Sequence, residues 1–202
     1  MTKYPIGIFI SGRGSNLKSI IDVSKDFSFP GKISLVFSDN PDAKGIELAY
    51  KNNIDVISLD INDFKNKSDF EEEILKLIKP YNLKLVCLAG YMKILSKRFI
   101  DKFPGRIINI HPSLLPKYKG LNTHRRAIEN NETVTGCTVH YVNENLDGGE
   151  IVLQKEVRID NSDTEHTLAD KVLKEEHIIY PEAIKLVLKK WCPHLKKSDW
   201  FR

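Results

Sequence analysis

The sequence predicts an α/β protein with a Rossmann-like, mostly parallel twisted sheet flanked by helices, followed by a C-terminal antiparallel hairpin and a long C-terminal helix. Five short runs rich in β-branched and aromatic residues alternate with helical segments over the first 130 residues, which is the pattern of βαβ units. Two longer β-rich runs, 134–142 and 150–159, then follow with only the loop 143–149 between them, which predicts an antiparallel pair. Finally, an apolar stripe at helical spacing predicts one helix over 164–191, capped by Asp163.

The remaining elements follow from local patterns. We expect parallel strands at 4–10, 33–37, 56–59, 83–88 and 106–110, and helices at 17–23, 45–51, 68–79, 96–103 and 123–130. Ser68 and Glu71 have the spacing of a capping box, which predicts that they open the third helix. The turn 89–95 combines small and apolar residues, so it suits packing against either a flat ring or the next helix. The last eleven residues, with Pro193, are expected to form a surface tail.

Length and charge indicate one domain that binds small molecules. With 202 residues and 41% hydrophobic content, we expect a single domain over 1–202. The 31 basic residues interleave with 27 acidic ones, and Lys-Lys pairs occur only at 189–190 and 196–197. Nucleic-acid binding usually needs a basic stripe, so the net charge of +4 favours small anionic substrates and no nucleic-acid partner. A monomer and a homodimer both remain open.

Cysteine usage and apolar runs predict neither a metal site nor a membrane span. Cys87, Cys137 and Cys192 have unrelated spacings, and we expect reduced thiols, two of them in the core. The chain has no CxxC or HExxH pattern, so no structural metal is expected. The chain begins directly with a strand, and no apolar run reaches the roughly 18 residues of a membrane span. We therefore expect a cytoplasmic protein.

The loop 11–16, Ser-Gly-Arg-Gly-Ser-Asn, joins the first strand to the first helix. Such a loop suits an anion, because glycines let backbone N–H groups approach the ligand and the helix N-terminus is electropositive. It lacks the third glycine of the dinucleotide fingerprint and the Gly-Lys-Ser/Thr of a P-loop, which disfavours NAD and ATP. On the residues alone, a simple helix N-cap at Ser15 or Asn16 is an equal alternative.

The fifth strand carries two polar side chains, Asn109 and His111, within an apolar run. Strand side chains alternate with period two, so both lie on one face. Ligands of open α/β sheets bind at the carboxyl ends of strands, and acyl chemistry needs an oxyanion donor beside an acid or base. The alternative is a hydrogen-bonded strand end that leads into a loop stiffened by Pro112 and Pro116.

Two further acids lie in the C-terminal part of the sequence. Asp147 precedes two glycines in the loop 143–149, where it fits either a turn or a ligand-binding role. The loop is longer than a tight hairpin needs, which favours the ligand-binding role. Glu176 and His177 lie near the middle of the predicted C-terminal helix, where an exposed face is the default expectation.

Three motifs now stand together: Ser-Gly-Arg-Gly-Ser-Asn-Leu at 11–17, Asn-Ile-His-Pro-Ser-Leu-Leu-Pro at 109–116 and Leu-Asp-Gly-Gly at 146–149. In this order they resemble the phosphoribosylglycinamide (glycinamide ribonucleotide) formyltransferase family, and the likeness extends to Glu-His-Ile-Ile-Tyr-Pro at 176–181. The resemblance implies the formyltransferase fold and formyl transfer from 10-formyltetrahydrofolate, a cosubstrate, to the amine of glycinamide ribonucleotide. The products would be formylglycinamide ribonucleotide and tetrahydrofolate, in de novo purine (IMP) biosynthesis, without a metal.

The resemblance also implies roles for individual residues. Asn109 and His111 would stabilise the oxyanion of a tetrahedral adduct, His111 would protonate the departing folate nitrogen, and Asp147 would raise the pKa of His111 and relay protons. The N-terminal half would hold the ribonucleotide, its phosphate on the glycine loop, and the C-terminal half would hold the folate. Ribonucleotide binding is implied for Gly14, Ser15, Asn16 and Glu176, and folate binding for Lys67, Met92, Lys93, Ile94, Leu95, Asn109, Asn143 and Leu146.

Three positions depart from the family pattern. Lys67 stands where relatives often carry Arg near the folate tail, so it keeps the charge and loses the bidentate fork. Lys119 and Asn122 stand where relatives commonly have Pro and His, in the loop after the second motif.

Other activities share parts of this pattern. Formyltetrahydrofolate hydrolase uses the same Asn, His and Asp set with water as acceptor, and usually has an N-terminal regulatory domain that we do not expect here. Methionyl-tRNA formyltransferase adds a tRNA-binding domain for which 202 residues leave no room, and a sugar-nucleotide formyltransferase is disfavoured by size and by the glycine loop. A folate- or nucleotide-binding protein without catalysis would not need an amide, an imidazole and a carboxylate together.

Overall fold

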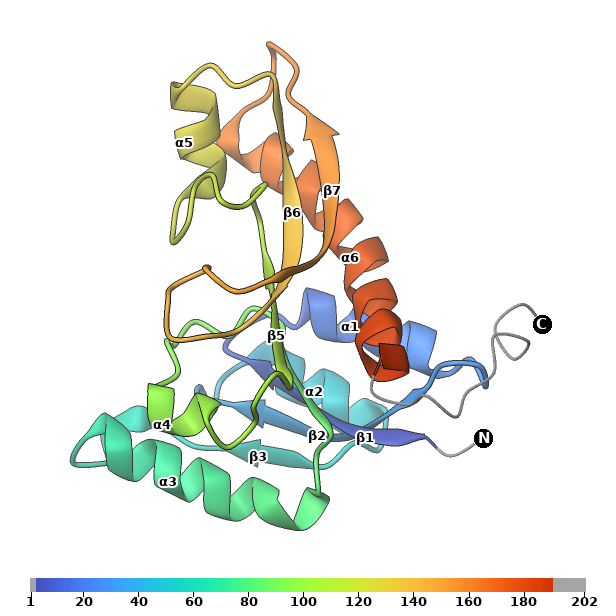
Figure 1. Cartoon of the computed structure of the whole chain (residues 1–202), viewed down its shortest axis with the longest axis vertical. Coiled ribbons are helices and arrows are strands. Elements are labelled where there is room, and N and C mark those ends of the chain that lie inside the picture. The colour runs from blue at the N-terminus through green and yellow to red at the C-terminus, as the bar shows by residue number, and fades with distance from the viewer. Residues whose placement is uncertain (1–2, 191–202) are drawn as a thin grey trace.

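The computed structural model describes residues 3–190, and these contain a seven-stranded sheet in the order β3-β2-β1-β4-β5-β6-β7 (Figure 1). The parallel strands are β1 (Tyr4–Ile10), β2 (Gly31–Ser38), β3 (Val56–Ser58), β4 (Leu85–Leu88) and β5 (Ile107–His111). Strand β6 (Val134–Tyr141) runs antiparallel to both β5 and β7 (Ile151–Arg158). The predicted fold class is confirmed, including the change to an antiparallel hairpin after the fifth strand.

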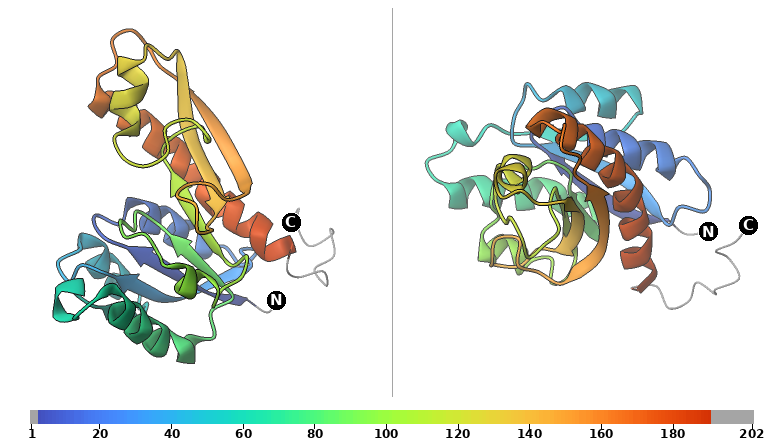
Figure 2. Two further views of the ribbon diagram at one scale, coloured as in Figure 1. Left: turned by 60° about the vertical axis from the view of Figure 1, so that its left-hand side comes forward. Right: turned by 90° about the horizontal axis from the view of Figure 1, so that it is seen from above.

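Helices cover both faces of the sheet (Figure 2). One face packs against α1 (Ser15–Ser24), α2 (Lys44–Lys51) and α6 (Glu165–Lys190), and the other against α3 (Lys67–Ile78) and α4 (Lys97–Ile100). In β1, Ile8 and Ile10 join the first of these cores and Phe9 joins the second, because side chains alternate along a strand. All three are fully buried, as expected for a parallel strand covered on both sides.

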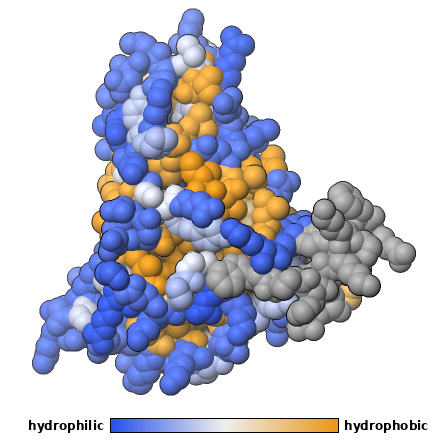
Figure 3. All heavy atoms as spheres, in the orientation of Figure 1, coloured by the Kyte–Doolittle hydropathy of each residue, from blue (hydrophilic) through white to orange (hydrophobic). Residues whose placement is uncertain are grey.

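The hairpin lies at the far edge of the sheet. Helix α5 (Thr123–Glu129) precedes β6, and two short 3-10 turns, η1 (Ile61–Asp63) and η2 (Lys79–Tyr81), complete the described elements. Figure 3 shows apolar side chains along the strip where β6 and β7 run in Figure 1. Strand β7 is the edge strand, and its first residue, Ile151, is 43% exposed. Strand β6 is almost entirely buried, so it can present side chains to β5 away from water.

Two predicted helix caps are wrong. Asn66, not Ser68, caps α3: its side-chain oxygen accepts a hydrogen bond from the Asp69 N–H at 3.0 Å, two residues before the predicted cap. Thr164 caps α6, since its hydroxyl accepts from the Thr167 N–H at 3.2 Å. Asp163 instead accepts from the ammonium of Lys171 at 2.6 Å.

Two of the three cysteines lie within the described residues. Cys87 and Cys137 are free and buried, as predicted, and burial raises the pKa of Cys137 to about 12. Cys192, the pair 196–197 and the predicted tail 192–202 lie outside the described residues. Within residues 3–190, no helix combines the length and hydropathy that a membrane crossing requires, and no group of His, Cys, Asp and Glu could hold a metal ion.

Candidate active site

A polar cluster lies at the carboxyl end of β5. Asn109 and His111 belong to this strand, and the register with β6 places His140 opposite Asn109. The loop between β6 and β7 brings Asp147 to the same place: its carboxylate lies 3.4 Å from Nδ1 of His111 and 3.5 Å from Nε2 of His140. The predicted catalytic residues Asn109, His111 and Asp147 therefore meet, and His140 joins them.

Hydrogen bonds fix the tautomer of His140. Its Nδ1 lies 2.8 Å from the carbonyl of Tyr141, which can only accept, so Nδ1 carries a proton. In the neutral ring Nε2 is then an acceptor, and it receives the Asn109 amide at 3.3 Å. One N–H of Asn109 is held in this way, and the other remains available to a ligand.

His140 was not predicted from the sequence, although a signal was present. Thr138 and His140 are polar residues at period-two spacing in a mostly apolar strand that also contains Thr135, a signal similar to the one that identified Asn109 and His111. The hydroxyl of Thr138 donates to the Ser113 carbonyl at 2.6 Å and accepts from the Leu115 N–H at 3.1 Å. Thr138 thereby holds the loop that follows His111.

The surroundings of His111 favour the neutral form of its ring. Its Nε2 donates to the carbonyl of Tyr118 at 2.9 Å, which leaves Nδ1 facing Asp147. Burial lowers the pKa of His111, and the Tyr118 carbonyl and the Asp147 carboxylate offset this only in part. The Asp147 carboxylate raises the pKa of His111, as expected. Burial lowers this pKa by more, so the net shift is downward.

Asp147 is held in the ionised form. Burial raises its pKa, but the contact with His140, a 2.8 Å hydrogen bond from the Gly120 N–H and the charge interactions with both imidazoles outweigh this, so the pKa lies below the ordinary value. Its backbone is left-handed, with φ of 47°. Asp and Asn tolerate this conformation better than most residues.

The glycine loop meets the start of α1 without a side-chain cap. Gly14 is the N-cap residue, with φ of 76°, and no side chain accepts from the first turn. The alternative of an N-cap at Ser15 or Asn16 is therefore wrong, and backbone N–H groups of this turn remain available to an anion. A Cβ at Gly14 would lie 2.7 Å from the Gly45 backbone, so this close approach of α2 requires glycine.

Asn16 and Glu176 meet although 160 positions separate them. The Asn16 amide donates to the Glu176 carboxylate at 2.7 Å, and both side chains are buried. Burial raises the pKa of Glu176, and Asn16 offsets this in part. The default expectation of an exposed Glu176 is thus wrong. The side-chain oxygen of Asn16 is buried without a partner, which suits an N–H or O–H donor on a ligand rather than a phosphate oxygen.

The segment 89–96 follows β4, which lies between β1 with its glycine loop and β5 with the polar cluster. Sheet order reverses between β1 and β4, and the loops after these strands lie at this switch point, where ligands of doubly wound sheets bind. Tyr91 and Leu95 pack into the core, whereas Met92 and Ile94 are each 62% exposed. Two side chains of this turn therefore pack against the protein, and two apolar side chains face outward.

The remaining predicted ligand residues are spread around these groups. Lys93 is exposed, and Leu146 in the hairpin loop is 52% exposed. Asn143 bonds within its own loop, where its oxygen accepts from the Asn145 N–H at 2.9 Å. Lys67 pairs with Glu71 at 3.7 Å. Ser15 is the first residue of α1.

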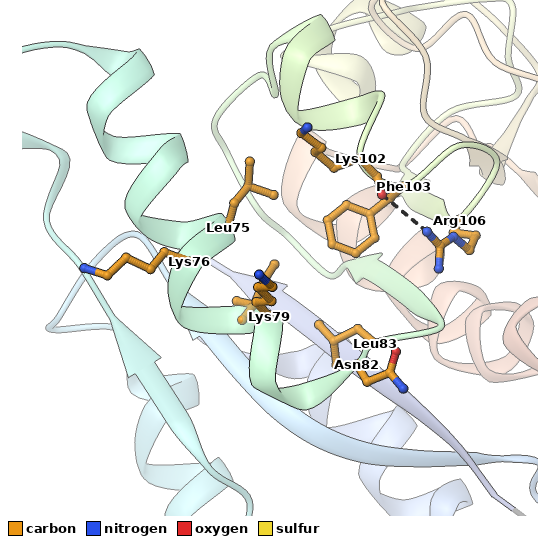
Figure 4. Close-up of a pocket in the computed structure, with 9 residues that line it drawn as sticks. Leu75, Lys76, Lys79, Asn82, Leu83, Lys102, Phe103 and Arg106 are labelled. Atoms are coloured by element: carbon orange, nitrogen blue, oxygen red, sulfur yellow. Dashed lines mark hydrogen bonds between the residues drawn. The ribbon is translucent and has the colours of Figure 1, made fainter.

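A separate cavity of about 560 Å³ lies at the opposite end of the strands (Figure 4). Leu83 precedes β4 and Arg106 precedes β5, so this cavity borders their amino ends, whereas Asn109 and His111 lie toward the carboxyl end. None of the predicted site residues lines it. The polar cluster is thus a different feature of the molecule.

An amide donor, an imidazole and a carboxylate lie together beside the switch point of a doubly wound sheet, an arrangement that suits an α/β enzyme of the acyl-transfer type. Residues 5–184 match the model of the formyl transferase family. The chain belongs to this family.

Named relatives agree with this assignment. Phosphoribosylglycinamide formyltransferase of Escherichia coli (strain K12) is 42% identical over 179 residues, which are 89% of this chain and 84% of the relative. The trifunctional purine biosynthetic protein adenosine-3 of Homo sapiens is 40% identical over 185 residues, which are 92% of this chain and only 18% of that protein. The crystal structure of phosphoribosylglycinamide formyltransferase from Brucella melitensis superimposes with a TM-score of 0.90 at 42% identity, covering 93% of this chain and 96% of that one.

Proposed function

We propose that this protein transfers the formyl group of 10-formyltetrahydrofolate to the amine of glycinamide ribonucleotide. The products are formylglycinamide ribonucleotide and tetrahydrofolate, a step of de novo purine biosynthesis in the cytoplasm. The observation that carries the proposal is the cluster of Asn109, His111 and Asp147, in which His140 contacts both Asn109 and Asp147. The names of relatives at about 40% identity over most of the chain support the choice of substrates.

Asn109 and His111 divide the chemistry between them. Attack by the amine on the formyl carbon places negative charge on the formyl oxygen, and the free N–H of Asn109 stabilises that charge. His111 takes up the proton lost by the amine, and the imidazolium beside Asp147 then gives one proton to the departing folate nitrogen, which returns the ring to its neutral form. One proton thus moves from the amine to the leaving nitrogen, and the reaction balances without a metal.

Asp147 acts through His111. An imidazolium forms while both ring nitrogens carry a proton, and the ionised carboxylate stabilises it. Since burial holds the pKa of His111 low, the ring returns its proton readily once the adduct collapses.

The ribonucleotide is assigned to the glycine loop and α6. Backbone N–H groups at Gly14, Ser15 and Asn16 suit its phosphate, because the first turn of α1 has no side-chain cap. Glu176 and the unpartnered oxygen of Asn16 suit hydroxyl or amide groups of the ligand.

The folate is assigned to the segment 92–95 and the hairpin loop. Met92, Ile94 and Leu146 expose apolar side chains, an arrangement that suits a flat ring system. Lys93 and Lys67 supply positive charge for the acidic tail, and Asn143 holds the loop. Both proposed substrates are small molecules. All the protein groups in this proposal come from one chain, which fits either a monomer or a homodimer.

The test is an acceptor panel. The purified protein is mixed with 10-formyltetrahydrofolate and, in parallel, with glycinamide ribonucleotide, methionyl-tRNA or buffer alone, and formation of tetrahydrofolate is followed. We expect turnover that depends on the ribonucleotide. Folate product that forms at the same rate in buffer alone would mean a hydrolase, and binding without turnover would mean a non-catalytic binding protein.

A further inference from the structure

The segment 89–96 is held at its beginning by the glycine loop. The Ser11 N–H donates to the carbonyl of Gly90 at 3.2 Å, and the hydroxyl of Ser11 accepts from the Met92 N–H at 2.8 Å. Of the two bonded residues, Gly90 and Met92, the second comes directly before Lys93 and Ile94, whose side chains are exposed. The first half of the segment is therefore fixed by backbone hydrogen bonds.

The end of the segment is held by a buried acid on a different helix. Glu71 belongs to α3 and is only 5% exposed. One carboxylate oxygen accepts from the Ser96 N–H at 2.8 Å, and the other accepts from the Ser96 hydroxyl. Both oxygens are thus used by a single residue at the end of the segment.

Ser96 also begins helix α4. Its hydroxyl oxygen accepts from the Phe99 N–H at 3.2 Å, which makes Ser96 the N-cap. The hydroxyl has one proton, which it gives to Glu71, so the two bonds complement each other. The position of Glu71 therefore fixes where the chain leaves the segment and turns into α4.

We propose that Glu71 is a positioning residue for the formyl donor, acting through the segment 92–95; this rests on the proposed function. Met92 and Ile94 are exposed, so contacts with the core do not fix them, and their direction depends on the anchored backbone at Met92 and Ser96. A carboxylate is costly to bury, and here its hydrogen bonds go to the backbone and hydroxyl of one loop residue.

Glu71 also orients a second group assigned to the donor. The ammonium of Lys67 lies 3.7 Å from the same carboxylate, one helical turn earlier on α3, and is 46% exposed. An acidic folate tail would reach an ammonium whose position Glu71 has already set. Loss of Glu71 therefore removes support from the segment 92–95, which is assigned to the folate ring, and from Lys67, which is assigned to the folate tail.

The chain offers a matched control at the next position. Glu72 also lies on α3 and also reaches the start of α4, through an ion pair with Arg98, but both side chains are at least half exposed. Glu72→Gln removes a link between the same two helices and leaves the Ser96 bonds in place. Glu71→Ala removes the buried link, and Glu71→Gln keeps the side-chain shape but removes the charge and one of the two acceptor oxygens.

Steady-state kinetics with both substrates varied separates the possible roles. We expect Glu71→Ala to raise the KM for 10-formyltetrahydrofolate by about 10-fold or more, since hydrogen bonds to a charged group are lost. The KM for the ribonucleotide should change by less than about twofold, and Glu71→Gln should lie between Glu71→Ala and wild type because its amide oxygen still accepts from Ser96. Equal rises in both KM values, or the same effect in Glu72→Gln, would overturn the proposal.

Hydrogen exchange provides a readout that does not need activity. The Ser96 amide should exchange faster in Glu71→Gln than in Glu72→Gln or wild type, because its acceptor is weakened. Unchanged protection at Ser96 would overturn the positioning role even if the enzyme turns over. Absence of formyl transfer in the wild-type protein would instead overturn the proposed function, and the exchange result would still decide the role of Glu71 in holding the segment.

Discussion

Asp147→Asn tests the proton chemistry with little disturbance of the fold. Asn tolerates the left-handed backbone that Asp147 adopts, and its side-chain oxygen can still accept from the Gly120 N–H. The substitution therefore keeps the shape of the loop and removes one negative charge. The amide cannot stabilise the His111 imidazolium as the carboxylate does.

The expected loss follows from the distance between the two groups. Opposite unit charges separated by 3.4 Å interact by about 5 kcal/mol at an effective dielectric constant of about 20. The Asp147 side chain is only 8% exposed, so screening by water is weak. At 1.36 kcal/mol for each tenfold change in rate, we expect kcat for formyl transfer to fall by about 10³-fold.

The assay is steady-state formyl transfer at saturating concentrations of both substrates, with thermal unfolding as the check on folding. Glu144→Gln is the control, because Glu144 is an exposed acid in the same loop. We expect this control to keep kcat within about twofold. A kcat for Asp147→Asn within about tenfold of wild type would refute the role of Asp147 in stabilising the imidazolium.

Three further predictions concern neighbouring groups. In an NMR titration, His111 should have a pKa below its ordinary 6.5, because burial outweighs Asp147, and still lower in Asp147→Asn; a pKa above 6.5 would contradict this. His140→Ala should lower kcat by about tenfold or more and leave both KM values nearly unchanged, because Asn109 loses the acceptor that orients it; kinetics with an unchanged kcat would contradict this. Asn16→Leu should raise the KM for the ribonucleotide with the folate KM largely kept, and equal damage to both would refute the assignment.

The sheet was predictable because its strands are short apolar runs separated by helices. Hydrophobic burial on both faces is a strong and local signal, as β1 and β5 illustrate. The caps of α3 and α6 were missed because Asn66 and Ser68 lie only two positions apart, Asp163 and Thr164 are adjacent, and the residue types within each pair have similar capping propensity. A choice between such neighbours depends on which backbone N–H is reached, and the sequence does not specify it.

The sequence indicated which residues form the candidate site, but not the contacts and burial of their side chains. Asn109 and His111 stand out because polar residues are unexpected in a buried strand. The contact of Asn16 with Glu176 joins α1 to α6, and no local pattern indicates it. The net direction of the His111 pKa depends on burial by the loops that follow β5 and β6, which appears only once the chain is folded.

The most direct test of the central claim is a double-mutant cycle on formyl transfer. His111→Ala, Asp147→Ala and the double variant are compared by kcat with glycinamide ribonucleotide as acceptor, after each has been shown to fold. Asp147 acts through His111 in this account, so the double variant should be no more than about tenfold slower than the slower single variant. Losses that multiply in the double variant would show that the two residues act independently and would contradict the account.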